Sequence, residues 1–246
     1  MSFGKNMHFP YVPEGFALNS KIKMNGLDFL RLLQEGVFPV AFFDPQYRGI
    51  LDKQKYGNEG VGRGWRRCAL KQMDECIINQ FVCEISRILA PSGHMFLWID
   101  KFHLCSGFRD WFSNTDLDIV DLISWDKGRI GMGYRTRRRT EYCVVLQKIP
   151  RRAKGVWTKH DIPDTWREEI TNKSHVHQKP VMLQSKLIDA VTSENDVVID
   201  PAAGSYSVME AAANVNRNFL GCDIADNHSD MDVMAYIDED RARKSA

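Results

Sequence analysis

Two short apolar runs, far apart in the chain, each end abruptly in an Asp-Pro pair. Residues 38–43 precede Asp44, and residues 196–199 precede Asp200. A continuous apolar run of this length is typical of a strand buried on both faces of a sheet, and proline cannot continue a central strand. Each aspartate is therefore expected where a strand passes into a loop. In an open α/β sheet ligands bind at this edge, so two such edges predict two ligands side by side.

Strand-like and helix-like patterns alternate through the remainder of the chain. Such alternation predicts an α/β fold with a mostly parallel, doubly wound sheet and helices on both faces. With 246 residues and 43% hydrophobic content, the chain suits a single domain over residues 1–246. Residues 150–175 show no clear period. Apolar spacing predicts helices at 65–89, 102–111, 181–191 and around 208–213, and apolar runs predict strands at 38–43, 94–99, 119–125, 142–146, 196–199 and 219–222.

The formal net charge is only +1, but the charges are unevenly distributed. From Lys127 to Lys159, eleven lysines and arginines stand against one acid, Glu141. Past Asp223 the balance turns acidic. A basic segment inside a near-neutral protein indicates a local contact with a polyanion. The alternative interpretation is a solvated face whose arginines pair with acids of the fold.

The six cysteines and seven histidines show no spacing typical of a zinc site or a redox motif. His175 and His177 stand two apart, but no third ligand is evident near them, so no metal is expected. The chain shows no signal-peptide pattern, and no apolar run approaches the length of a transmembrane span. We therefore expect a soluble cytoplasmic protein with no membrane partner.

The segment from Asp200 to Ser205 lies between a predicted strand and a predicted helix. A tight turn at this place directs backbone N–H groups toward a ligand. Asp223 ends the next strand, about 20 residues beyond Gly204, where an acid commonly binds the hydroxyls of a ribose. The glycine-rich spacing needed for a pyrophosphate is absent, which favours an adenosine-bearing cofactor without one, and S-adenosylmethionine fits. The alternative is an ordinary turn between strand and helix.

The tetrad Asp44, Pro45, Gln46 and Tyr47 places a carboxylate, a proline carbonyl and a phenol ring around one point. Two acceptors and a flat ring suit a planar group with an exocyclic NH₂, because the acceptors take its two N–H bonds and the ring stacks on its face. A nucleobase flipped out of its helix is such a group. The alternative is a strand terminus with Tyr47 in the core.

Together these motifs resemble those of the beta class of amino-group DNA methyltransferases, in which the catalytic tetrad precedes the cofactor motif. The order and spacing match over roughly residues 25–225. Residues 44–47 resemble the Asp-Pro-Pro-Tyr tetrad, residues 84–98 the helix, turn and strand after it, residues 175–180 the His-Pro-x-x-Lys-Pro segment, residues 200–205 the Asp-Pro-Phe-x-Gly-Ser motif, and residues 221–223 the ribose-binding acid motif.

The chain departs from the family pattern at three positions. Gln46 stands where the family usually has proline, Ala202 where phenylalanine is usual, and Tyr206 where a second glycine is usual. In the family, that phenylalanine is expected to line the cofactor pocket near the reacting methyl group. Tyr206 is a candidate to supply the ring from a different position.

The resemblance implies a Rossmann-like methyltransferase fold and methyl transfer from S-adenosylmethionine to N6 of adenine in double-stranded DNA, since family members with Asp first in the tetrad usually methylate adenine. Cytosine N4 stays open, as do an RNA or protein substrate and a non-catalytic nucleic-acid-binding protein on a decayed fold. The implied catalytic residues are the four of the tetrad. The implied cofactor-binding residues are Lys179, Pro180, Asp200, Pro201, Ala202, Gly204, Ser205 and Asp223.

Sequence selectivity in this family comes from a region that corresponds here to a short basic insertion within about residues 127–174. So short a region implies a short or relaxed recognition site, and a homodimer stays open as a way to read more sequence. The glycine-rich loop at residues 56–64 is expected to close over the flipped base. The expected DNA-binding residues are Arg63, Arg66, Arg135, Arg137, Arg138, Arg139, Arg151, Arg152 and Lys154.

Overall fold

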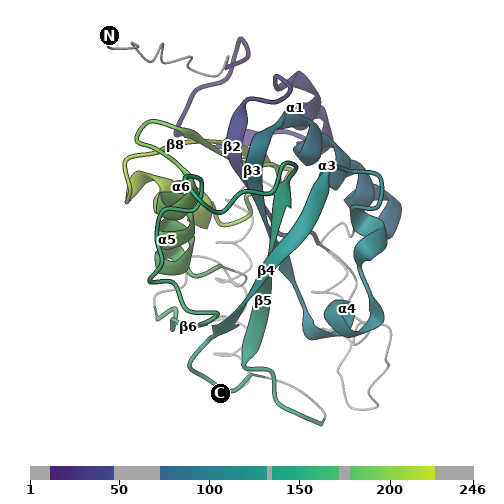
Figure 1. Cartoon of the computed structure of the whole chain (residues 1–246), viewed down its shortest axis with the longest axis vertical. Helices are drawn as coiled ribbons and strands as arrows, with labels where there is room; N and C mark the ends of the chain where they lie inside the picture. Colours follow the sequence, from purple (N-terminus) through teal and green to yellow (C-terminus); the bar gives the residue numbers. More distant parts are fainter. Residues whose placement is uncertain (1–11, 47–72, 132–134, 172–177, 225–246) are drawn as a thin grey trace, which may run out of the picture.

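An eight-stranded sheet with helices on both faces organises the chain (Figure 1). The structure, a computed structural model, describes residues 12–46, 73–131, 135–171 and 178–224. In sheet order the strands are β1 (Ile22–Lys23), β8 (Asn218–Asp223), β7 (Val197–Asp200), β2 (Phe38–Phe43), β3 (Leu89–Ile99), β5 (Thr140–Lys148), β4 (Leu117–Asp126) and β6 (Thr165–Arg167). The helices are α1 (Gly26–Leu32), α3 (Glu75–Ile88), α4 (Lys101–Ser106), the 3₁₀ turn η2 (Arg109–Trp111), α5 (Val181–Val191) and α6 (Ser207–Ala213).

The predicted mostly parallel sheet is confirmed, with one antiparallel strand inside it. Strands β1, β8, β7, β2 and β3 are paired in parallel, and β4 pairs in parallel with β6. Strand β5 runs antiparallel to both β3 and β4. The connection from β4 to β5 contains no helix among its described residues, and a short loop of this kind joins antiparallel neighbours.

Alternating side chains of the strands build two separate cores, one on each face of the sheet. On β3, Met95 and Leu97 pack with α1 and α3, whereas Phe96 and Trp98 pack with α5 and α6. All four are at most 1% exposed, and burying each large apolar side chain stabilises the fold by about 1.5–3 kcal/mol. The continuous apolar runs of the sequence are explained by this burial on both faces.

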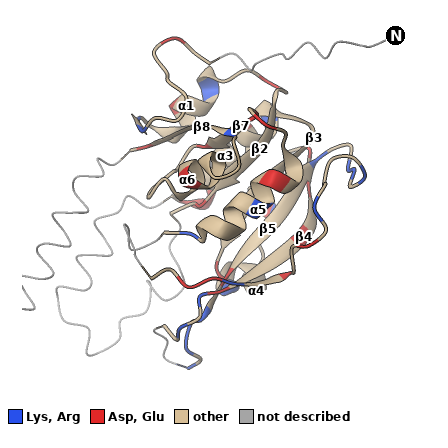
Figure 2. Cartoon of the chain, turned by 90° about the vertical axis from the view of Figure 1, so that its left-hand side faces the viewer, with Lys and Arg blue, Asp and Glu red and all other residues tan. Residues whose placement is uncertain are grey.

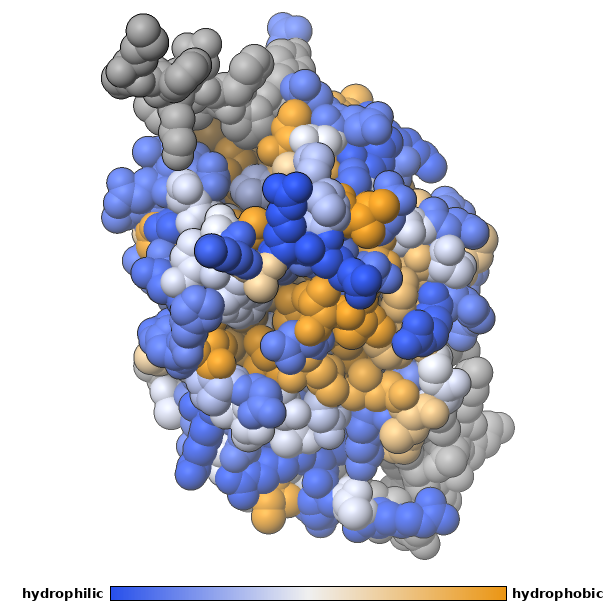
Figure 3. Space-filling model, viewed as in Figure 1, coloured by the Kyte–Doolittle hydropathy of each residue, from blue (hydrophilic) through white to orange (hydrophobic). Residues whose placement is uncertain are grey.

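Strand β4 departs from this burial pattern. Its side chains Ile119, Val120 and Leu122 are 37–41% exposed. Figure 3 shows an apolar patch on the side of the molecule that carries β4 and β5. The strand is also irregular here, because its register against β5 shifts between Ile119 and Asp121.

The helix boundaries differ from the predictions at two places. The helix expected from residue 65 begins at Glu75, where Asp74 caps it by accepting a hydrogen bond from Ile77 N at 2.8 Å, and residues 65–72 lie outside the described residues. The helix expected over 102–111 is divided into α4 and η2, because Gly107 adopts a φ of +97° that ends the first helix. Helix α1 and strands β1 and β6 were not predicted.

Candidate active site

Three aspartates stand at the carboxyl ends of three neighbouring parallel strands. Asp44 follows β2, Asp200 ends β7 and Asp223 ends β8. Parallel pairing sets Ala41 level with Ile199, and Asp200 level with Gly221. The two Asp-Pro turns seen in the sequence therefore lie side by side at one edge of the sheet, the edge where ligands of open α/β folds bind.

The turn after β7 is fastened to the end of β8 by hydrogen bonds. The Asp200 carboxylate accepts a bond from Ala202 N at 3.1 Å, and the Asp223 carboxylate accepts one from Gly204 N at 2.9 Å. Gly221 is needed for this close approach, because a Cβ there would lie 2.3 Å from Asp200 O. The residues expected to hold the cofactor thus form one connected structure.

Three carboxyl groups converge at this edge. Asp200 is only 5% exposed, and its pKa is raised well above the usual range by burial and by the nearby carboxylates of Asp44 and Asp223, while the bond from Ala202 N opposes the shift. Converging carboxylates attract cationic groups. The sulfonium and ammonium groups of S-adenosylmethionine carry the charge that such a site would attract.

Tyr206 does not supply the missing aromatic ring at an open pocket. Its ring is 4% exposed and packs edge-on against Phe219 at 5.9 Å, in the core beneath α6. The hydroxyl donates a hydrogen bond to Ile22 O at 3.1 Å. Burial raises the Tyr206 pKa. The residue therefore joins the turn to β1, and the expectation that it lines the cofactor pocket is not supported.

A buried lysine lies beside the tetrad. Lys179 Nζ is 2.9 Å from Asp44 Oδ2 and 2.9 Å from Glu141 Oε2, and it lies 5.3 Å from the centre of the Trp98 ring. Glu141 Oε1 is in turn 2.6 Å from Lys127 Nζ. The sequence placed Lys179 at the cofactor; the structure places its amine between two carboxylates.

The pKa values of this cluster follow from its pairing. Burial alone would lower the Lys179 pKa, but the charges of Asp44 and Glu141 outweigh burial and raise it. Burial would likewise raise the Glu141 pKa, but Lys179 and Lys127 lower it to about 2. Both side chains are therefore charged at neutral pH. Glu141 was not among the predicted site residues, although its being the one acid in a basic run was a signal.

Glu168, in the basic insertion, fixes the start of α5. Lys179 and Pro180 lie immediately before this helix. The Glu168 carboxylate accepts hydrogen bonds from Met182 N and Leu183 N, both at 3.0 Å, and from Trp166 Nε1 at 2.8 Å. Pro180 has no capping side chain of its own, so Glu168 satisfies the free N–H groups of the helix. No pattern in the sequence indicates this cap.

The predicted DNA-binding arginines fall into two groups. Arg139 donates to both oxygens of Asp126 at 2.6 and 2.8 Å, and this bond is the main reason that the Asp126 pKa is lowered to about 2. Arg151 lies 3.3 Å from Asp118. Arg139 and Arg151 therefore pair with acids of the fold, which is the alternative interpretation that the sequence left open for the basic segment.

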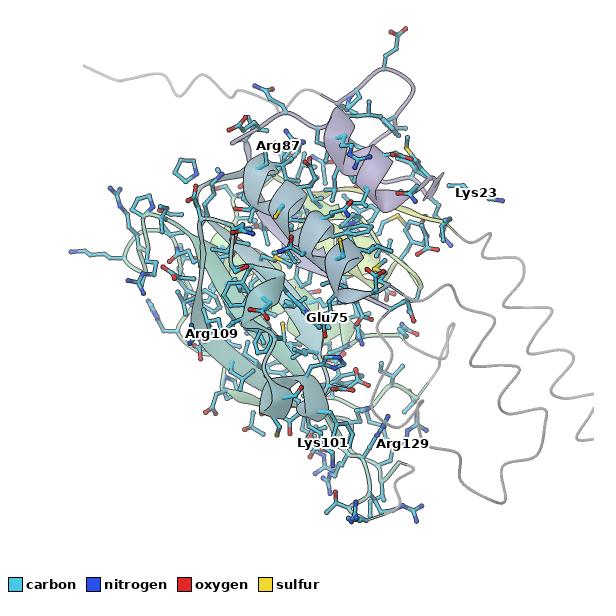
Figure 4. All side chains as sticks on the ribbon, turned by 90° about the vertical axis from the view of Figure 1, so that its right-hand side faces the viewer. Lys23, Glu75, Arg87, Lys101, Arg109 and Arg129 are labelled. Atoms are coloured by element: carbon cyan, nitrogen blue, oxygen red, sulfur yellow. The ribbon has the colours of Figure 1, made fainter. Side chains whose placement is uncertain are left out.

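The other predicted DNA-binding cations of the segment are exposed at opposite ends of β5: Arg135, Arg137 and Arg138 precede its start, and Arg152 and Lys154 follow its end. Figure 2 shows basic residues at both places. Arg138 lies over the Phe102 ring, and Arg137 donates to Gly131 O at 2.9 Å. Lys101 donates to Thr136 at 2.9 Å, and Figure 4 shows that Lys101 and Arg129 extend from the same end of the molecule. In the described part of the chain, no ion pair involves the side chains of Arg135, Arg152 or Lys154.

Several predicted residues lie outside the described residues. These are Tyr47, the loop at 56–64 with Arg63, and Arg66. The two ends of this part of the chain are described, and Met73 N donates a hydrogen bond to Gln46 O at 2.7 Å. This bond joins the two described residues on either side of that part of the chain.

Within the described residues, no helix is long and apolar enough to cross a membrane. The same residues contain no group of three or more His, Cys, Asp or Glu side chains arranged to hold a metal ion. The charged groups described above are therefore the polar features on which the site is built.

A doubly wound sheet with two Asp-Pro turns at one edge defines a methyltransferase of the Rossmann-like class. Comparison with known proteins identifies the family: residues 40–234 match the family N6_N4_Mtase, described as "DNA methylase". The chain belongs to this family. It is a DNA methyltransferase, and S-adenosylmethionine is its methyl donor.

Relatives and solved structures agree with this assignment. The chain is 55% identical to Type II methyltransferase M.HhaII of Haemophilus parahaemolyticus over 208 residues, covering 84% of this chain and 91% of the relative. It is 22% identical to Type II methyltransferase M2.MboI of Moraxella bovis, covering 80% of each. The fold is similar to that of M1.HpyAVI bound to SAM, with a TM-score of 0.59, 19% identity and coverage of 84% and 94%. It is also similar to the PvuII DNA methyltransferase (cytosine-N4-specific), with a TM-score of 0.62, 12% identity and 86% coverage of each.

Proposed function

We propose that this methyltransferase modifies the N6 amino group of adenine in double-stranded DNA. The observation that carries the proposal is Asp44 at the carboxyl end of β2, next to the Pro45 carbonyl and to the turn at residues 200–205. Asp at this place favours adenine through the resemblance stated above. The N4 amino group of cytosine is the alternative target, because the Asp44 carboxylate and the Pro45 carbonyl could accept its protons equally well.

The amino nitrogen of a base is a poor nucleophile, because its lone pair is delocalised into the ring. Hydrogen bonds from its protons to the Asp44 carboxylate and the Pro45 carbonyl favour a pyramidal nitrogen and stabilise the positive charge that develops on attack. Bound S-adenosylmethionine supplies the activated methyl group. Holding the nitrogen in line with that group accounts for much of the remaining acceleration.

The cofactor is proposed to be held by the turn Asp200, Pro201, Ala202, Gly204 and Ser205, with Asp223 on the ribose. Asp223 already accepts the Gly204 N–H bond, and a carboxylate has acceptor sites for further donors. Pro180, buried at the start of α5, lies along the same edge. Lys179 serves the tetrad side of this edge, because its amine contacts Asp44.

DNA contact is assigned to the basic segment within residues 127–174, in a single domain. Phosphate contacts position a protein on DNA, whereas base contacts specify the sequence. With Arg139 and Arg151 paired to acids, fewer arginines remain for reading bases, which supports a short or relaxed site. The exposed side chains of Arg135, Arg138 and Arg152 are the first candidates.

Nucleoside mass spectrometry of duplex DNA incubated with the enzyme and S-adenosylmethionine tests the proposal. We expect N6-methyladenine as the product, in many sequence contexts. If the product is N4-methylcytosine, the proposed mechanism stands and the target base is cytosine. No methylated nucleoside, together with no cofactor binding by calorimetry, would instead favour a non-catalytic nucleic-acid-binding protein.

A further inference from the structure

The ionic cluster at the tetrad joins three segments that are distant in the sequence. Asp44 follows β2, Glu141 lies at the start of β5, and Lys179 directly precedes α5. The Lys179 side chain is 13% exposed, and those of Asp44 and Glu141 are 27% and 31% exposed. One lysine amine thus contacts both carboxylates at 2.9 Å.

Burial of a lysine is costly unless its charge is paired. Lys179 has two carboxylates, and Trp98, 1% exposed, lies below its amine. Glu141 in turn has a second lysine, Lys127. Positive and negative charges therefore alternate from Asp44 to Lys127, and each of these partly buried charges has a partner of opposite sign. The arrangement restricts where the Lys179 amine can lie.

We propose that Lys179, anchored by Glu141, is a positioning residue that orients the Asp44 carboxylate and keeps it ionised for the amino group of the target base. This inference rests on the proposed function of the same site. It assigns to Lys179 a role in the methyl-transfer step, distinct from contact with the cofactor.

The need for such a residue follows from the charges around Asp44. Asp200 ends the neighbouring strand β7, and its carboxyl group interacts electrostatically with those of Asp44 and Asp223. Negative neighbours favour protonation of a carboxylate, and a protonated Asp44 would be a poorer acceptor for an amino proton. Lys179 opposes this effect, and its bond to Oδ2 occupies one of about four acceptor sites of the carboxylate.

Glu141 is the anchor because its carboxylate contacts the amine at 2.9 Å, the same distance as Asp44. Its other oxygen contacts Lys127, at the start of the basic segment. Lys127 is therefore connected to the Asp44 carboxylate through three ion pairs, Lys127–Glu141, Glu141–Lys179 and Lys179–Asp44. Movement of Glu141 would move the Lys179 amine and, with it, the Asp44 carboxylate. Misplacement of a catalytic group by about 1 Å costs about 100-fold in rate.

Steady-state kinetics of the full-length enzyme on duplex DNA test the proposal, with Lys179→Met as the main variant. We expect kcat to fall about 100-fold, while the dissociation constant for S-adenosylmethionine stays within about threefold of wild type. The acidic limb of the kcat profile should move to higher pH, because Asp44 loses its cation. Lys179→Arg should recover at least about tenfold of the loss, since it restores the charge.

Lys186→Met is the matched control. Lys186 lies on α5, is 45% exposed and pairs with Asp161, which is not part of the tetrad cluster. The kcat and pH profile of this variant should therefore match wild type. Glu141→Gln is a second test that keeps the lysine. It should lower kcat by about tenfold as the amine loses its anchor, with no upward movement of the acidic limb, because a negative charge has been removed.

Unchanged kcat in both Lys179→Met and Glu141→Gln would overturn the proposal. So would a Lys179→Met enzyme whose cofactor affinity falls more than tenfold while kcat and its pH profile are retained, since Lys179 would then be a cofactor ligand. If Lys179→Met does not fold, Glu141→Gln decides: lowered kcat supports the role and unchanged kcat refutes it. A wild-type enzyme that yields no methylated nucleoside would refute the proposed function itself.

Discussion

Three aspartates occupy equivalent places at the ends of neighbouring strands, yet their surroundings differ. Asp44 is paired with a lysine, Asp223 accepts a backbone N–H of the turn, and Asp200 is buried between them. The lysine favours an ionised Asp44, whereas burial raises the pKa of Asp200. In the proposed function, Asp44 accepts the amino protons and Asp223 binds the ribose, whereas Asp200 supports the turn.

Replacing Asp44 by alanine is expected to abolish methylation while cofactor binding is retained. The change removes the charged acceptor for the amino group but leaves the hydrogen bonds of the turn after β7 in place. Labelled methyl incorporation into duplex DNA measures the first effect and calorimetry with S-adenosylmethionine the second. An Asp44→Ala enzyme with full activity would refute the catalytic assignment.

Replacing Asp223 by alanine is expected to weaken cofactor binding by about 1.5–3 kcal/mol, the loss typical of a hydrogen bond to a charged group. The substitution also removes the acceptor of the Gly204 N–H group, so the turn loosens together with the ribose contact. Titration calorimetry measures the change. Asp161→Ala is the control, because Asp161 is 61% exposed and pairs only with Lys186 among the described contacts; equal affinity in both variants would contradict the ribose assignment.

At the scale of elements, the connection between β4 and β5 contains two kinds of basic residue: those paired with acids of the fold and those exposed without such a pair. Lys127 and Arg139, at its two ends, pair with Glu141 and Asp126. Backbone bonds from Lys127 N to Arg139 O and from Gly131 N to Arg138 O hold its described residues together. The arginines that fasten this connection are therefore distinct from those available to DNA.

Neutralising Arg135 and Arg152 together is expected to reduce the dependence of DNA binding on salt. Each phosphate contact contributes about 0.9 to the slope of log affinity against log salt, so the slope should fall by about two. Binding to duplexes of different sequence should weaken alike, as measured by fluorescence anisotropy across a salt series.

Arg151→Ala is the comparison for that measurement, because Arg151 lies in the same segment but is 3.3 Å from Asp118. It should change the salt slope less than either exposed arginine. A double variant of Arg135 and Arg152 with an unchanged slope would place the DNA contact elsewhere on the chain.

At the scale of the whole molecule, the sheet brings together charges from distant segments and balances them. The carboxylate of Glu141, which is 31% exposed, lies between Lys179 and Lys127. Lys127 comes 14 residues before Glu141 and Lys179 comes 38 residues after it. Both ion pairs form only in the folded protein. Protonation of Glu141 would break them, so the free energy of unfolding depends on the ionisation of Glu141.

Glu141→Gln is expected to lower the free energy of unfolding at pH 7 by about 1–3 kcal/mol. Folding lowers the Glu141 pKa from 4.5 to about 2. The stabilising contribution is therefore fully present above about pH 4.5 and is lost as the pH falls toward 2. The difference between wild type and variant should shrink over that range in urea unfolding experiments.

Glu210→Gln is the control, since Glu210 is an exposed residue of α6 and no ion pair of the described residues includes it. Its free energy of unfolding should follow wild type at every pH. A Glu141→Gln difference that grows on acidification would contradict the sign of the pKa shift.

The sequence by itself determined six of the eight strands, the class of fold and the edge of the sheet where the site is expected. The apolar run ending at Phe43 coincides with β2, and the helix predicted at 181–191 coincides with α5, because local periodicity and burial are properties of neighbouring residues. Asp44, Asp200 and Asp223 were recognisable for the same reason, since each ends a strand.

Only the tertiary structure decided which charges meet. Lys179 was expected at the cofactor and lies against Asp44 and Glu141, Arg139 was expected on DNA and pairs with Asp126, and Tyr206 was expected at the pocket and lies in the core. Residues far apart in sequence meet according to the order and register of the strands, and short-range patterns do not encode either one. The sequence therefore indicated the edge of the sheet, and the packing of the strands determined which partner each side chain has there.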